Sequence, residues 1–246
     1  EAISALDGVV TEIHRMPSWR RFSADPRTGA VRQILQERAT TPLRTSNENS
    51  VFAERPSISV LTNGDVIWYS QRDGWGHLYY YAGATGQLRH PITQGAWLVR
   101  KIVRVDELKR QIYFMASGRD SARDPYEQYL YSVRFDGSRL RLLTPEAANH
   151  EWPHGDAHRS RARFSPSGRY FLDSYSRPDL PPVFVLRTAE GRLTQRLEQA
   201  DVSPLHVDGY GTIEPFVVLA ADGVTPIYGN LFRPSTFHAT RRYPVI

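Results

Sequence analysis

Apolar strand-like runs alternate with polar turns along this chain, and one two-strand unit occurs four times. In each copy an apolar run ends in a turn that contains glycine, and a second run follows. The turn glycines are Gly29, Gly86, Gly137 and Gly191, which lie 57, 51 and 54 residues apart. A repeat of about 50 residues built from β-hairpins is typical of the blades of a β-propeller. The pattern therefore predicts an all-β fold that contains about four propeller blades.

The four copies of the hairpin unit cover residues 20–35, 67–93, 128–144 and 182–198. Further apolar runs precede three of these copies, so that residues 57–93, 97–144 and 162–198 each follow the plan of a whole blade. Asn-Gly at 63–64 and the segment FSPSG at 164–168 have the composition of tight turns between strands. These segments predict blades of consecutive antiparallel strands.

The pattern changes near residue 200. We expect a short helix within 199–205, strands at 213–219 and 227–232, and the beginning of a buried strand at 243–246. We therefore predict two parts, a propeller portion over residues 1–200 and the start of a second domain, which the sequence does not complete, over residues 201–246.

Composition narrows the function classes. No run of roughly 18 apolar residues is present, so we expect no membrane-spanning helix in this chain. Cysteine is absent, which excludes disulfides, thiol nucleophiles and cysteine-based zinc sites. The net charge is +5, but the basic residues are spread along the chain and many lie beside acids, as in Arg119-Asp120. A nucleic-acid-binding domain gathers basic residues on one face, so nucleic-acid binding is not expected.

The order of several motifs resembles one family. The segment DGWGHLY at 73–79 resembles the "(E/D)G(Y/W)xHLY" segment of dipeptidyl peptidase IV-type serine peptidases, which belong to the prolyl oligopeptidase superfamily. Further similar segments are TQGAW at 93–97, SGRD at 117–120, LTP at 143–145, FSPSG at 164–168 and YPVI at 243–246. The resemblance covers most of residues 10–246.

The resemblance implies an eight-bladed propeller that covers an α/β-hydrolase domain. This chain would then hold about half of the propeller and the first strands of the hydrolase. The implied activity of the whole protein is removal of N-terminal dipeptides, with Pro or Ala second, from short peptides. The implied partners are a peptide substrate and the protein's own hydrolase domain. No cofactor is implied, and the implied location is extracytoplasmic or periplasmic.

The residues that perform such chemistry are missing from the sequence. A serine hydrolase of this type needs a G-x-S-x-G segment that exposes its nucleophile, and no such segment occurs here. The paired glutamates with which the family holds a substrate's α-ammonium group are also absent. We therefore expect no catalytic residue in this chain, and we expect the chain alone to be inactive.

A few residues are candidates for a site. Phe52 falls near the position of the family's aromatic wall beside the substrate, although packing in the core or rim is the favoured explanation for an aromatic residue there. The series His150, His154, Asp156 and His158 has the side chains of a metal site. Pro153 and Gly155 argue against a helix that would align these side chains, so a polar loop is the preferred interpretation and no metal is expected.

Two more features have structural and functional interpretations. His77 lies in a predicted strand, where a structural hydrogen bond is favoured over catalysis. The charged residues Asp120, Arg123, Asp124 and Glu127 form either a patch at the mouth of the propeller or a solvated loop.

The alternative to a peptidase portion is a non-catalytic propeller that binds a protein or peptide. Half a propeller also exposes blade faces and strand edges, so association into a homo-oligomer is expected. A G-x-S-x-G segment further along the same gene, followed by Asp and His, separates the peptidase from the binding module.

Overall fold

Antiparallel strands make up nearly all of the regular structure, as the alternating pattern predicts. The structure is a computed structural model that describes residues 18–38, 57–150, 164–207 and 213–244. The described residues pack as two units, one formed by residues 1–121 with 130–142 and the other by residues 122–129 with 143–246.

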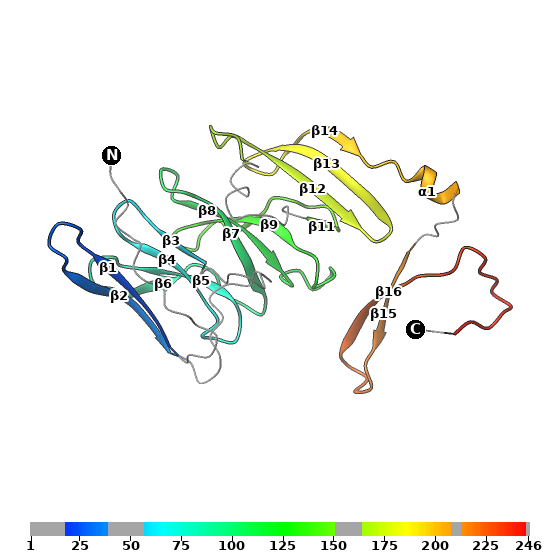
Figure 1. The fold of residues 1–246 in the computed structure, drawn as a ribbon, viewed down its shortest axis with the longest axis horizontal. Helices are drawn as coiled ribbons and strands as arrows, with labels where there is room; N and C mark the ends of the chain where they lie inside the picture. The colour runs from blue at the N-terminus through cyan, green and yellow to red at the C-terminus, as the bar shows by residue number, and fades with distance from the viewer. Residues whose placement is uncertain (1–17, 39–56, 151–163, 208–212, 245–246) are drawn as a thin grey trace. The chain divides into compact units, whose positions relative to one another are not determined.

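The first unit contains a hairpin and two four-stranded sheets (Figure 1). The hairpin pairs β1 (Ser18–Ala24) with β2 (Val31–Arg38). The first sheet has the order β3-β4-β5-β6, and the second has the order β10-β9-β8-β7. Their strands are β3 (Ile58–Val60), β4 (Val66–Ser70), β5 (His77–Tyr81), β6 (Leu88–Pro91), β7 (Leu98–Asp106), β8 (Gln111–Ser117), β9 (Tyr129–Arg134) and β10 (Arg141–Leu142).

The second unit contains a third four-stranded sheet and a separate hairpin. The sheet has the order β11-β12-β13-β14, and its strands are β11 (Asn149–His150), β12 (Tyr170–Arg177), β13 (Leu180–Thr188) and β14 (Leu193–Gln199). The helix α1 (Ser203–Val207) follows, and then β15 (Glu214–Leu219) pairs with β16 (Pro226–Leu231). None of the described helices has the length and apolar character that crossing a bilayer requires.

The four repeated turns adopt one backbone conformation. Gly29, Gly86, Gly137 and Gly191 have φ values of 71°, 72°, 81° and 89°, in the left-handed region that favours glycine. Three of these turns also approach a carbonyl of the preceding repeat closely. A Cβ atom at Gly86 would lie 2.1 Å from the carbonyl oxygen of Ile34, and one at Gly191 would lie 2.5 Å from that of Leu143. The repeat spacing in the sequence therefore reflects a turn that glycine alone fits.

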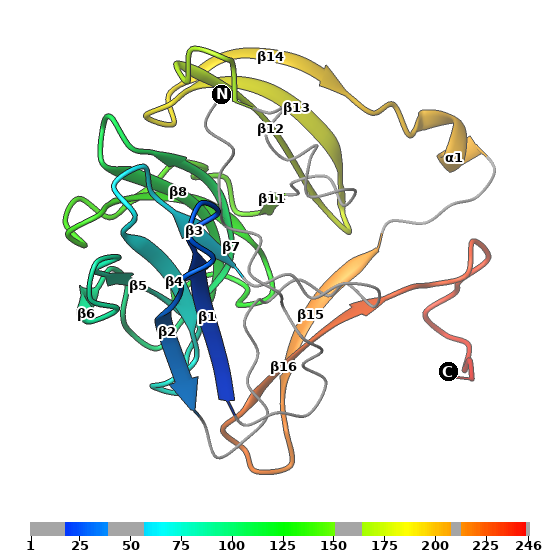
Figure 2. The same ribbon diagram turned by 60° about the vertical axis from the view of Figure 1, so that its left-hand side comes forward.

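Apolar faces of successive sheets pack against each other within the first unit. One face of the β3–β6 sheet packs on the β1–β2 hairpin, and both views show the two side by side (Figure 2). This core contains Ile34, Leu35, Val66, Trp68, Tyr79 and Tyr81. Trp97 stacks with Phe114 and Tyr131 at centroid distances of 6.2 and 6.5 Å in a second aromatic layer. The rings of Tyr80 on β5 and Phe135 after β9 lie 5.9 Å apart between centroids, so buried aromatic rings also join one blade to the next.

The structure confirms the all-β fold and the four hairpin repeats. The strands expected at 213–219 and 227–232 are observed with bounds shifted by at most one residue, as β15 and β16. The helix expected within 199–205 is shifted, because β14 continues to Gln199 and α1 begins at Ser203. The predicted boundary near residue 200 stays a prediction.

Candidate functional site

A group of four charged side chains, three of them buried, lies on one face of the β11–β14 sheet. His150 comes from β11 and pairs in register with Tyr175 of β12. Asp173 comes from β12 and Arg187 from β13, and Arg187 lies opposite Phe171. Successive side chains of a strand point to opposite faces, so Phe171, Asp173 and Tyr175 share the face that carries His150. Glu146 joins this group from the connection before β11.

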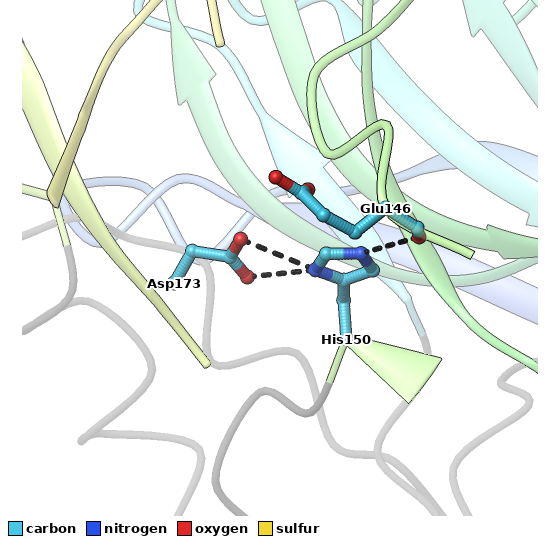
Figure 3. Close-up of side chains that lie close together, drawn as sticks. All are labelled: Glu146, His150 and Asp173. Atoms are coloured by element: carbon cyan, nitrogen blue, oxygen red, sulfur yellow. Dashed lines mark hydrogen bonds and ion pairs between the residues drawn. The ribbon is translucent and has the colours of Figure 1, made fainter. Parts of the chain in front are cut away.

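Short contacts link the four charged residues, and Figure 3 draws three of them, Glu146, His150 and Asp173. His150 Nδ1 lies 2.9 Å from Asp173 Oδ1, and its Nε2 lies 3.1 Å from the main-chain oxygen of Glu146. Arg187 donates from Nε to Asp173 Oδ2 at 2.8 Å and from Nη2 to Glu146 Oε2 at 2.6 Å. The side chains of His150, Asp173 and Arg187 are each 1% exposed. The Glu146 side chain is 30% exposed, so the ionic network is buried at three of its residues and reaches solvent at Glu146.

The network sets the charge state of its members. Burial pushes the pKa of Asp173 upward, but the hydrogen bonds and charges of His150 and Arg187 outweigh this and hold it below its usual value. Burial lowers the pKa of Arg187, and the carboxylates of Glu146 and Asp173 more than compensate and raise it. Asp173 is thus an anion and Arg187 a cation in the folded protein.

The same residues have the composition of a metal site. One oxygen or nitrogen atom from each of Glu146, His150 and Asp173 lies within 4.8 Å of the others. Arg187 already donates to both carboxylates, so a divalent ion would be buried beside a guanidinium group. Both nitrogens of His150 also lie against oxygens of the protein. The arrangement fits an internally satisfied ionic network and does not fit a metal ion.

A second buried carboxylate lies in the first unit. Glu37 of β2 accepts hydrogen bonds from Trp68 Nε1 and Ser70 Oγ of β4. Arg72 lies 3.4 Å from Glu37 through Nη2 and places its guanidinium 4.1 Å from the ring centroid of Tyr79. Burial, followed by the charge of Asp73, raises the pKa of Tyr79 to about 12. The carboxylate thus connects the hairpin to the neighbouring blade through hydrogen bonds.

His77 has the structural role that the sequence favours. It is fully buried, and its Nδ1 lies 3.0 Å from Thr93 Oγ1. Its Nε2 lies 2.9 Å from the carbonyl oxygen of Gly95, whose φ of 124° favours glycine. The ring edge meets Trp97 at a centroid distance of 4.9 Å. His77 therefore fixes the connection between β6 and β7 to β5.

The other candidate residues have mixed outcomes. Phe52, His154, Asp156 and His158 lie outside the described residues, so the prediction for Phe52 stays a prediction. In the charged loop, the Arg123 guanidinium lies 4.8 Å from the ring centroid of Tyr129. Tyr129 donates a hydrogen bond to Glu127. At least part of this loop is therefore bonded to the protein instead of being freely solvated.

The sequence did not reveal the network around His150. The sequence favours a polar loop at His150, and this prediction is wrong, because His150 lies in the two-residue strand β11. Asp173, Arg187 and Glu146 were not candidates, because each stands among strand or turn residues with no local motif. The one available signal in the sequence was the charge of Asp173 and of Arg187, each of which lies in a predicted strand with apolar neighbours.

Comparison with known proteins assigns the chain to a family. The model of the "Dipeptidyl peptidase IV (DPP IV) N-terminal region" matches residues 18–182. "Probable dipeptidyl peptidase 4" of Aspergillus fumigatus is 31% identical over 183 residues, which are 72% of this chain and 22% of that protein. Dipeptidyl peptidase 4 of Trichophyton equinum is 32% identical over 150 residues, which are 55% of this chain and 18% of that protein.

A solved structure supports the fold. The crystal structure of Porphyromonas gingivalis dipeptidyl peptidase 4 matches with a TM-score of 0.70 and 19% identity, over 93% of this chain and 29% of that one. This chain thus spans less than a third of each of these relatives. Because the family model matches well over half of its residues, the chain belongs to the dipeptidyl peptidase IV N-terminal region family.

Proposed function

We propose that this chain is the propeller portion of a serine dipeptidyl peptidase. In that protein it would restrict access to a hydrolase domain, which would remove N-terminal dipeptides with Pro or Ala second. The observation that carries the proposal is the family match over residues 18–182 together with relatives named dipeptidyl peptidase 4. The chemistry would be acyl transfer through a seryl intermediate in the hydrolase domain.

The hairpin formed by β15 and β16 supports a further domain. Its side chains are exposed on both faces, including Phe216, Val218 and Leu219, which are 43%, 49% and 62% exposed. A two-stranded hairpin with two apolar faces is marginally stable in water unless other residues cover it. The start of an α/β-hydrolase sheet would have this character, because such sheets are covered on both faces.

The direct test compares this chain with a product extended along its gene. We expect the extended product to hydrolyse Ala-Pro and Gly-Pro chromogenic substrates and to react with a serine-hydrolase probe. We expect the 246-residue chain to do neither, because it has no G-x-S-x-G segment. Probe labelling of the short chain would contradict the assignment of catalysis to a later domain. An extended gene without the motif would favour the binding-module alternative.

A further inference from the structure

Both ring nitrogens of His150 lie against groups that accept hydrogen bonds and have no hydrogen to give. Nδ1 lies 2.9 and 3.2 Å from the two oxygens of Asp173, which is ionised. Nε2 lies 3.1 Å from the main-chain oxygen of Glu146. A neutral imidazole has one donor and one acceptor nitrogen, whereas an imidazolium has two donors. The imidazolium form alone satisfies both contacts.

The charges of the cluster lead to the same form. Asp173 and Glu146 contribute two negative charges, and Arg187 contributes one positive charge. A neutral His150 would leave one net negative charge in the cluster, in which the side chains of His150, Asp173 and Arg187 are buried and that of Glu146 is 30% exposed. A protonated His150 brings the sum to zero. Because unbalanced buried charge is costly, the protonated ring is favoured.

Among the residues that the structure describes, the other side chains in ring contact with His150 are uncharged. Tyr129, the first residue of β9 and part of the second unit, and Tyr175 of β12 face the ring at centroid distances of 5.5 and 5.3 Å. Burial is the largest cause of a raised pKa at both phenols, so both are neutral. Neutral aromatic rings accept a neighbouring cation. The main-chain N–H of His150 donates to the oxygen of Gln128 at 2.9 Å.

We propose that His150 is a proton-dependent clamp, in which its second ring proton ties the connection at Glu146 to β11 and β12. When that proton is lost, a nitrogen lone pair faces an oxygen about 3 Å away. The bond to the Glu146 carbonyl then opens, because the opposing Asp173 carboxylate is the stronger acceptor. The clamp is closed in acid and opens as pH rises. This inference does not depend on the proposed peptidase function.

Nuclear magnetic resonance of the ¹⁵N-labelled chain tests the protonation state directly. Long-range ¹H–¹⁵N spectra distinguish an imidazolium from either neutral tautomer. At neutral pH we expect two protonated nitrogens at His150. We expect a single tautomer at His77, because the hydroxyl of Thr93 can donate to its Nδ1. A neutral tautomer at His150 under the same conditions would overturn the proposal.

Unfolding experiments test the consequence of the proton. We expect wild type to be more stable than His150→Gln at about pH 6. As the pH rises and His150 loses its second ring proton, the ratio of the variant's unfolding constant to that of wild type should shrink by up to about tenfold per pH unit. His90→Gln is the matched control, because His90 Nε2 has one carbonyl partner, that of Phe135 at 2.8 Å. A pH-independent difference for His150→Gln would contradict the clamp. If that variant does not fold, the spectra of wild type decide.

Discussion

His77 and His150 are both buried histidines in propeller strands, but their partners differ in kind. His77 faces a hydroxyl and a carbonyl, and the hydroxyl of Thr93 can donate or accept. His150 faces a carboxylate and a carbonyl, which can only accept. A neutral ring therefore satisfies the first site, whereas the second requires a charged ring. The comparison shows that burial alone does not fix the charge of a histidine, because its partners decide which form is satisfied.

The largest expected effect is at the charged site. Asp173→Asn removes the carboxylate between His150 and Arg187. The imidazolium and the guanidinium, both buried, then lose their shared anionic partner. We expect a loss of about 3–5 kcal/mol in the free energy of unfolding, measured by chemical denaturation. Asp179→Asn is the control, because the Asp179–Arg177 pair is about one third exposed, and we expect it to cost about 1 kcal/mol or less. Equal costs for the two variants would contradict the distinction.

A smaller effect is expected at the neutral site. Thr93→Val removes the hydroxyl that contacts His77 Nδ1 and accepts from the main-chain N–H of Leu78 at 3.0 Å. Two buried polar groups then lose a partner, so we expect a loss of about 1–3 kcal/mol on unfolding. Thr93→Ser keeps the hydroxyl and should cost about 1 kcal/mol for the lost methyl group. A serine variant as unstable as the valine variant would show that packing, not hydrogen bonding, holds this site.

The smallest effect is expected from added metal. Zn²⁺ should not raise the thermal midpoint of the chain by binding Glu146, His150 and Asp173, because Arg187 already donates hydrogen bonds to both carboxylates and would lie beside the metal ion. A ligand that binds the folded state would raise the midpoint. A rise in wild type that disappears in His150→Asn would show that the ionic network gives way to a metal ion.

Much of the fold was predictable because its signals are local. Alternation of apolar and polar residues marks a strand within about five residues, and glycine marks a turn that needs positive φ. The structural role of His77 was also predictable, since its partners Thr93 and Gly95 lie in the connection that directly follows the same hairpin. The prediction that Phe52 lies beside the substrate rests on resemblance to the family, and Phe52 is outside the described residues.

The ionic network was not predictable, because its members are far apart in sequence. His150 and Asp173 are separated by 23 residues, and Arg187 and Glu146 by 41. His150 stands beside other histidines that suggested a metal loop, and nothing near it in the sequence indicates a carboxylate partner. Only strand pairing brings these residues to one face.

The sequence by itself determined the repeating hairpins, the all-β fold and the absence of a nucleophile elbow from this chain, since each depends on neighbouring residues. The tertiary structure decided which polar groups are buried together. It placed Glu37 against Trp68 and Ser70, and Asp173 between His150 and Arg187. The physical reason is that an uncompensated buried charge is costly, so its partner is set by the packing of strands in space and not by separation along the chain.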